Sequence, residues 1–139
     1  MPDGFLDTNL FLHAQANDRH SEECRRFLTA VEHGVIHARL EPLVLHELSY
    51  ALPHYVKQMT RAQIAEYLGA ILAWPGVEGD KGAMTDAVER WAQTPGLAFV
   101  DAYLAALAAR DGCPIYTMNV RELAGQGVDV PCPLPDPPR

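Results

Sequence analysis

The sequence predicts an α/β fold with a mostly parallel sheet, and two patterns support this prediction. Short apolar runs with strand character, such as residues 4–6 and 114–118, are interspersed with longer segments in which apolar residues recur at helical spacing. Helical segments, rather than tight turns, connect these runs, and connections of that length allow parallel pairing.

The length and composition of the chain fit one globular domain and exclude several classes of protein. The 139 residues are 48% hydrophobic and 21% charged, and no apolar run approaches the ~20 residues that a membrane-spanning helix needs. No secretory signal is visible at the N-terminus, so we expect a cytoplasmic protein. The three cysteines are widely spaced, which argues against a disulfide framework and against a thiolate zinc site.

The net charge of −7 is unusual for a protein that binds nucleic acid, because phosphate contacts favour basic surfaces. Two interpretations remain open. The chain binds no nucleic acid, or it carries a cluster of carboxylates that needs a divalent cation to bring a phosphate close.

The first part of the chain predicts two strands and two helices. Residues 4–6 form a short strand, and Leu10 begins a short helix or turn. Ser21 is suited to cap the next helix, which runs to about His33 and ends before a glycine. Residues 35–38 form the second strand.

A longer helix begins at Pro42, since proline suits the first helical turn, and Pro53 should end or kink it. Helical spacing predicts that one face of this helix comprises Val44, Glu47, Leu48, Ala51 and Tyr55. Glu47 is therefore expected on an apolar face, where an unpaired charge is unfavourable.

Three further helices follow. Thr60 begins a capping box for the first of them, and Asp80 is suited to cap the second. The third contains Asp101 and closes at Gly112, because glycine readily adopts the left-handed conformation that ends a helix.

The C-terminal part predicts two more strands and a tail. Residues 114–118 are rich in strand-forming side chains, and residues 128–130 are expected as an edge strand. Residues 131–139 contain five prolines and are expected to be extended.

Four polar residues lie at the ends of predicted strands or on predicted helices with an apolar face. Asp7 and Asn119 each follow a predicted strand, and ligands of parallel sheets bind beyond the carboxyl ends of the strands. Glu47 and Asp101 lie on helices with apolar faces. Each has a plainer interpretation as a turn residue, a helix cap or half of an ion pair. Together, these hard oxygen donors predict one site for Mg²⁺ or Mn²⁺.

Four segments are FLDTN at residues 5–9, LHEL at 45–48, VDAYLAALA at 100–108 and IYTMN at 115–119. In order and spacing they resemble a PIN domain, and most closely the toxin of a VapBC-type toxin–antitoxin pair. The resemblance implies a PIN domain over residues 1–130, followed by a proline-rich tail over residues 131–139. It also implies a three-layer α/β/α sandwich around a central, mostly parallel sheet.

The resemblance further implies a Mg²⁺- or Mn²⁺-dependent endoribonuclease in which Asp7, Glu47 and Asp101 hold the metal ion. The fourth catalytic position of the family is often an aspartate. Here it is Asn119, which offers a carbonyl oxygen but no charge. Glu122 is a candidate to supply the missing carboxylate, and Thr8 and Asn9 are candidates to hold a ligand or a water molecule in place.

The implied partners are an RNA substrate, a cognate antitoxin protein and a second copy of the chain in a homodimer, with no membrane. The alternative is a non-catalytic PIN-like module that binds protein or RNA. Asn119 at the fourth position favours this alternative, whereas the three retained acids favour the nuclease. The sequence names neither the RNA that is cleaved nor the antitoxin.

Overall fold

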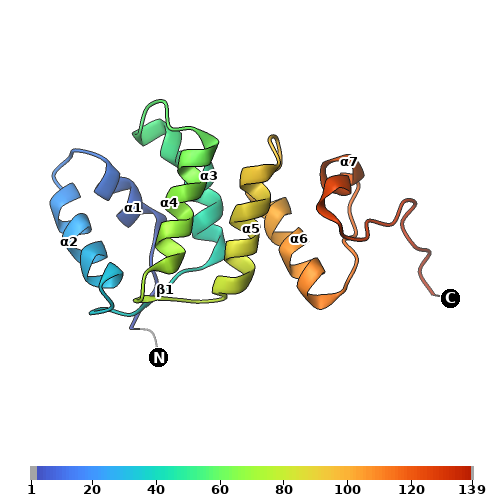
Figure 1. Cartoon of the computed structure of the whole chain (residues 1–139), viewed down its shortest axis with the longest axis horizontal. Coiled ribbons are helices and arrows are strands. Elements are labelled where there is room, and N and C mark those ends of the chain that lie inside the picture. The colour runs from blue at the N-terminus through green and yellow to red at the C-terminus, as the bar shows by residue number, and fades with distance from the viewer. Residues whose placement is uncertain (1–2, 139) are drawn as a thin grey trace.

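The computed structural model describes residues 3–138, and Figure 1 shows its helices arranged along the long axis of the molecule, from α1 and α2 at one end to α7 at the other. Among these residues, none of the helices combines the length and the apolar character that crossing a bilayer requires. In chain order the elements are α1 (Thr8–Gln15), α2 (Ser21–Glu32), β1 (Ala38–Arg39), α3 (Pro42–Tyr55), α4 (Arg61–Ala73), β2 (Val77–Glu78), α5 (Lys81–Gln93), α6 (Phe99–Asp111), α7 (Val120–Leu123) and a 3₁₀ turn (Ala124–Gln126).

The sheet is small and parallel. Strands β1 and β2 pair with Ala38 opposite Val77 and Arg39 opposite Glu78. Phe5 adds a parallel bridge to Arg39, on the side of β1 that faces away from β2. The α/β class and the parallel pairing that the sequence predicted are therefore confirmed, with a sheet that is shorter than expected.

Strand β1 begins later than the predicted second strand at residues 35–38. The backbone N–H groups of Val35 and Ile36 donate to the Ala30 carbonyl of α2, at 2.9 and 3.2 Å, so these residues close the helix instead of extending the sheet. Strand β2 has no counterpart in the prediction, because two residues between glycines give no periodic signal.

The strands predicted at residues 114–118 and 128–130 do not form within the described residues, so both predictions were wrong. The Ile115 N–H donates to the Asp129 carbonyl at 2.9 Å, but no ladder develops around this bond. Strand propensity reflects packing against neighbouring strands, and neither run has such a neighbour here.

Local signals placed most helix ends correctly. Thr60 forms the predicted capping box with Gln63, and Asp80 accepts a hydrogen bond from the Ala83 N–H at 3.3 Å. Ser21 does not cap α2. It is the first helical residue, and its hydroxyl donates to the Ala16 carbonyl at 2.9 Å. Pro53 lies in the last turn of α3, which continues to Tyr55 instead of ending at the proline.

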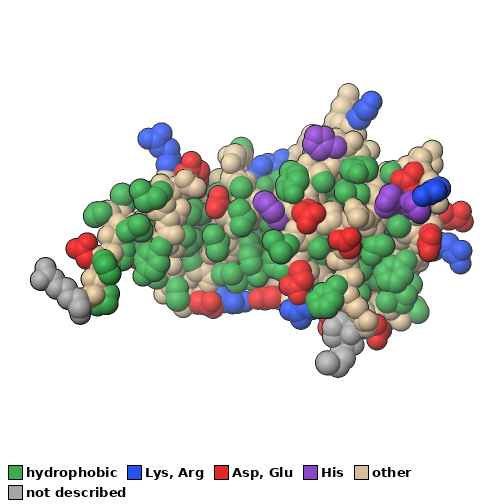
Figure 2. Space-filling model, turned by 180° about the vertical axis from the view of Figure 1, so that it is seen from behind, with side chains coloured by type: hydrophobic (Ala, Val, Ile, Leu, Met, Phe, Trp, Pro, Cys, Tyr) green, Lys and Arg blue, Asp and Glu red, His purple; other side chains and the backbone are tan. Residues whose placement is uncertain are grey.

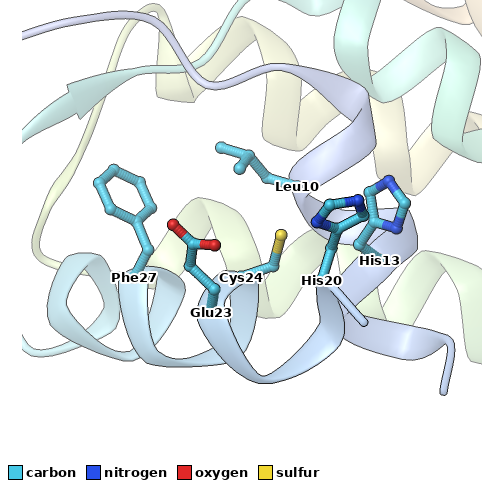
Figure 3. Close-up of a pocket in the computed structure, with 6 residues that line it drawn as sticks. All are labelled: Leu10, His13, His20, Glu23, Cys24 and Phe27. Carbon is cyan, nitrogen blue, oxygen red and sulfur yellow. The ribbon is translucent and has the colours of Figure 1, made fainter. Parts of the chain in front are cut away.

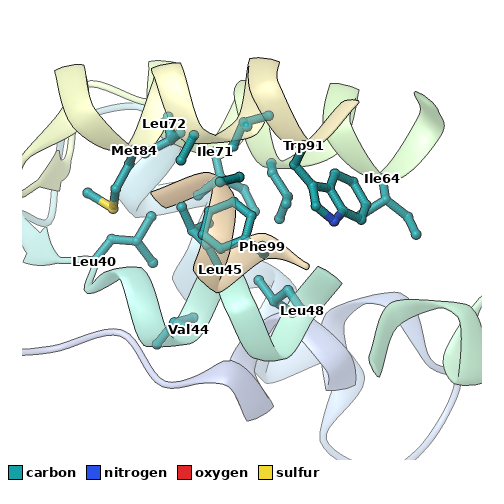
Figure 4. Close-up of a cluster of buried hydrophobic side chains, with 14 of the residues drawn as sticks. Leu40, Val44, Leu45, Leu48, Ile64, Ile71, Leu72, Met84, Trp91 and Phe99 are labelled. Carbon is teal, nitrogen blue, oxygen red and sulfur yellow. The ribbon is translucent and has the colours of Figure 1, made fainter. Parts of the chain in front are cut away.

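The part of the core that Figure 4 shows lies among helices α3, α4, α5 and α6, with Phe99 at the start of α6. The same core continues to Phe11 and Leu12 on α1 and to Leu28 and Val31 on α2. Helices α4 and α5 each bury one apolar face. The buried residues are Ile64, Leu68, Ile71 and Leu72 on α4, and Ala83, Met84, Ala87, Val88 and Trp91 on α5.

Arg61 stabilises the loop that connects α5 to α6. Its guanidinium donates to the carbonyls of Trp91 (2.7 Å), Thr94 (3.1 Å) and Leu97 (2.5 Å), and it stacks 4.0 Å from the centre of the Trp91 ring. Burial lowers the pKa of Arg61. These contacts fix where α6 begins and therefore where Asp101 lies.

The turn before β2 requires glycine at position 76. A Cβ atom there would lie 2.2 Å from the Ile36 carbonyl oxygen and 2.3 Å from that of Val31, both of them backbone atoms. The same residue accepts a hydrogen bond from the Ala38 N–H at 2.8 Å. The close approach of these three backbone segments therefore depends on the missing side chain.

We predict that Gly76→Ala lowers the melting temperature, because the backbone must shift to accept the methyl group. Gly69→Ala is the matched control. Gly69 lies inside α4, and a Cβ atom there would meet nothing within 4 Å, so the free energy of unfolding should rise by about 0.5–1 kcal/mol. Thermal denaturation of both variants tests this. An unchanged or higher melting temperature for Gly76→Ala would contradict the account of the turn.

Candidate active site

Asp7 lies between Phe5, which pairs with the sheet, and Thr8, the first residue of helix α1. The buried residue before it, Leu6, donates its N–H to the Arg39 carbonyl at 2.9 Å and so fixes the end of the strand segment. Asp7 is the N-cap residue of α1, but its exposed side chain makes no capping hydrogen bond. Its carboxylate also has no ion-pair partner among residues 3–138. Capping therefore does not explain this aspartate, and the carboxylate is available to a ligand.

Thr8 follows Asp7 and is 3% exposed. Its Oγ1 is buried and has no hydrogen-bond partner in the part of the chain that the structure describes. Buried hydroxyl groups are nearly always paired, so this one marks a polar position beside Asp7 that no described residue satisfies. Asn9, the other predicted supporting residue, is exposed.

Glu47 does not lie on the buried face of α3, so that prediction was wrong. The buried residues of α3 are Val44, Leu45, Leu48 and Leu52. This stripe is rotated from the predicted one, which turns Glu47 into solvent. The free-energy cost of burying the Glu47 charge is therefore absent. The carboxylate forms no ion pair with the described residues.

Asp101 lies in the first turn of α6 and is partly buried. Ala98, not Asp101, occupies the N-cap position, and the Asp101 carboxylate forms no ion pair within residues 3–138. The first turn suits a carboxylate, because the helix dipole is positive there. Its position depends on the loop that Arg61 holds.

Asn119 and Glu122 lie far from Asp7. Asn119 precedes α7 and Glu122 lies within it, both side chains are exposed, and Figure 1 places α7 at the opposite end of the long axis from α1. The Asn119 N–H donates to Thr117 Oγ1 at 2.9 Å. Within one chain, therefore, the fourth predicted position and its substitute do not join the other acids.

The donor chemistry suits Mg²⁺ or Mn²⁺, but the arrangement in one chain does not complete a site. Asp7, Glu47 and Asp101 offer oxygen ligands that no described Lys or Arg neutralises, and Thr8 adds an unpaired buried hydroxyl. Among residues 3–138, however, no three His, Cys, Asp or Glu side chains are grouped so that they could hold one metal ion. The convergence of the three acids on one cleft stays a prediction.

An apolar groove of about 410 Å³ lies between the first turns of α3 and α6. Glu41 and Pro42 line it on one side, and Phe99, Val100 and Tyr103 on the other. Burial raises the pKa of Tyr103, and the carboxylate of Asp80 raises it further. The phenol is therefore neutral, as suits an apolar wall.

A second hollow of about 410 Å³ lies between α1 and α2 (Figure 3). The rings of His13 and His20 meet edge to face there, with 5.0 Å between their centres, and His13 Nδ1 lies 2.8 Å from Asp18. Burial raises the pKa of Cys24, so its thiol stays protonated and is a poor metal ligand. None of the predicted site residues lines this hollow.

A family model for the PIN domain matches residues 4–122. The chain belongs to the PIN-domain family. The match includes Asp7, Glu47, Asp101, Asn119 and Glu122, and it is consistent with a nuclease-type function. No curated protein and no solved structure matches the chain.

One feature of this PIN domain gave no signal in the sequence. His46 lines the apolar groove with its Nδ1 buried and unpaired among the described residues, and its ring packs edge to face on Tyr50 at 5.4 Å. The residue types around it, at distant positions in the chain, form no recognisable motif. Only the packing of α3 against α6 brings them together.

We predict that Thr8→Val separates a structural role from a ligand-binding role. Removing the unpaired hydroxyl should raise the free energy of unfolding without metal by about 1 kcal/mol, because an unsatisfied buried group is unfavourable. It should also reduce the rise in melting temperature that Mn²⁺ produces, whereas Thr8→Ser, which keeps the hydroxyl, should retain that rise. An equal Mn²⁺ response in wild type and Thr8→Val would remove Thr8 from the site.

Proposed function

We propose that this PIN domain is a Mg²⁺- or Mn²⁺-dependent endoribonuclease that acts in the cytoplasm as the toxin of a toxin–antitoxin pair. The observation that carries the proposal is the unpaired carboxylate of Asp7, which follows the Phe5 bridge at the carboxyl end of a parallel sheet. That is where parallel sheets bind ligands. Membership of the PIN family supports the nuclease class.

In this proposal Asp7, Glu47 and Asp101 hold the divalent cation, and Asn119 or Glu122 occupies the fourth position. When bound, such a cation lowers the pKa of a water molecule and offsets negative charge on a phosphate. The chain carries a net charge of −7, so an RNA phosphate would otherwise be repelled from these acids. The cation thus reconciles an acidic protein with an RNA substrate.

Exposed apolar side chains support the antitoxin as a partner. Figure 2 shows hydrophobic side chains gathered over much of one face of the molecule, with acidic side chains and histidines among them. The apolar groove between α3 and α6 is bordered by Leu43, which is 71% exposed, and by Val100, which is 45% exposed. Large exposed apolar patches are typical of protein interaction sites.

A non-catalytic module that binds protein or RNA is the second candidate. It is favoured by the lack, among residues 3–138, of a group of side chains ready to hold a metal ion. The two candidates differ in their response to Mn²⁺. A nuclease binds Mn²⁺ through Asp7, whereas a decayed module has no reason to bind it there.

We predict RNA cleavage that requires Mg²⁺ or Mn²⁺ and that EDTA abolishes. Asp7→Asn and Asp101→Asn should each lower the cleavage rate by about 100-fold or more, because even groups that only orient metal ligands change activity by about 10- to 100-fold. Gel-based cleavage of a mixed RNA pool measures the rates, and circular dichroism checks that the variants fold.

Asp129→Asn is the matched control, because Asp129 is exposed and lies outside the proposed site. It should cleave at the rate of the wild type. Full activity in EDTA, or undiminished cleavage by both Asp7→Asn and Asp101→Asn, would reject the metal-dependent nuclease.

A further inference from the structure

The sheet ends in an open edge at Phe5. On one side of this segment, the Gly4 carbonyl accepts from Arg39 and the Leu6 N–H donates to Arg39, at 2.8 and 2.9 Å. Backbone groups alternate along an extended chain, so the N–H and C=O of Phe5 face the other way. Among residues 3–138 they have no backbone partner, and the Phe5 residue is 73% exposed. An apolar edge strand with unsatisfied backbone groups is a template for another strand.

A strand-forming segment without a partner strand lies in the C-terminal arm, which we define as residues 113–130. Ile115 is buried and bonds to Asp129, so the backbone groups of Tyr116 face the opposite side. No described backbone group bonds to Tyr116, whose exposed fraction is 64%, and Met118 is 83% exposed. The arm therefore has the same two features as the Phe5 edge: unpaired backbone groups and exposed apolar side chains.

The arm cannot reach the Phe5 edge of its own chain while its present contacts hold. Arg90 on α5 donates to the Gln126 carbonyl at 2.7 Å, and the Gln126 side chain donates to Thr94 Oγ1 at 3.0 Å. Leu123 is 1% exposed, which anchors α7 on the domain. Figure 1 shows the arm beyond α6, at the far end of the molecule from the sheet. The arm of a second copy has no such restriction.

We infer that two copies of this chain exchange their C-terminal arms, so that residues 114–118 of each copy add a strand to the Phe5 edge of the other. Such a pair is symmetric and closed, because each copy donates one arm and receives one. Parallel addition matches the rest of the sheet. It also places Asn119, which follows the added strand, at the same end of the sheet as Asp7, which follows Phe5 and Leu6.

The exchange accounts for the incomplete metal site, and in this respect it rests on the proposed function. Asp7 and Asn119 lie apart within one chain, but each site in the pair combines Asp7 of one copy with Asn119 of the other. The apolar groove begins at Glu41, two residues after the Arg39 that pairs with Phe5. It offers an apolar surface to Tyr116 or Met118 of the incoming arm.

Disulfide cross-linking between differently labelled copies tests the exchange. The exposed Cys113 and Cys132 are first changed to serine, which leaves the buried Cys24. One copy carries Phe5→Cys and the other carries Tyr116→Cys or Thr117→Cys, since a shift of one residue turns a side chain to the other face. Neighbouring strands lie about 4.8 Å apart, within the range of about 4.4–6.8 Å between Cα atoms that a disulfide spans.

The expected result is a disulfide-linked dimer in one of the two mixtures after mild oxidation, seen on a non-reducing gel. Phe5→Cys mixed with Tyr50→Cys is the matched control, because Tyr50 is 57% exposed but lies on α3, outside the arm. Dimer formation equal to this control in both mixtures would overturn the exchange. Where Phe5→Cys fails to fold, the mass of the unmodified protein decides, and a strict monomer at micromolar concentration overturns it.

A chain that carries both cysteines separates exchange from closure within one copy. Exchange gives a linked dimer, whereas a compact, internally linked monomer would show that the arm folds back on its own chain and would overturn the proposal. None of these readouts needs a metal ion or activity. Cleavage by a monomer would therefore reject the exchange alone, and a linked dimer that never cleaves RNA would reject only the proposed function.

Discussion

The backbone pairing at Arg39 is the constraint on which the rest of the structure depends. Arg39 joins the Phe5 segment, and its neighbours Ala38 and Leu40 bond to the Gly76 and Glu78 carbonyls on the other side. Each of the three segments leads directly into a helix: α1 after the Phe5 segment, α3 after β1 and α5 after β2. A parallel register of only a few residues thus sets the starting points of three helices at one edge of the sheet. Asp7 lies at this edge because of that register.

Local chemistry explains what the sequence predicted correctly. The Thr60 capping box, the Asp80 cap and the left-handed Gly112 depend on residues within a few positions of each other, and all three form as expected. The features that could not be predicted depend on distant partners. Which face of α3 becomes buried depends on how α1 and α6 pack against it, so Glu47 lies in solvent. Residues 114–118 have strand chemistry, but no sequence pattern shows whether a neighbouring strand is present.

The same distinction holds for the candidate site. The residue types and their places after a strand or at a helix start could be predicted for Asp7 and Asp101, and the family match over residues 4–122 supports the class of function. Their assembly into one site stays a proposal. In the proposed exchange, the unpaired groups of Phe5 and Thr8 in one copy and of Tyr116 in the other come together in one region.

A crystal structure of the protein with Mn²⁺, located by its anomalous scattering, tests the proposed site and the exchange together. We predict an Mn²⁺ ion bound by Asp7, with residues 114–118 of a second copy paired to the Phe5 edge and that copy's Asn119 facing the ion. An ion bound away from Asp7 would contradict the proposed site. An ion bound at Asp7 beside an arm of the same chain would contradict the exchange.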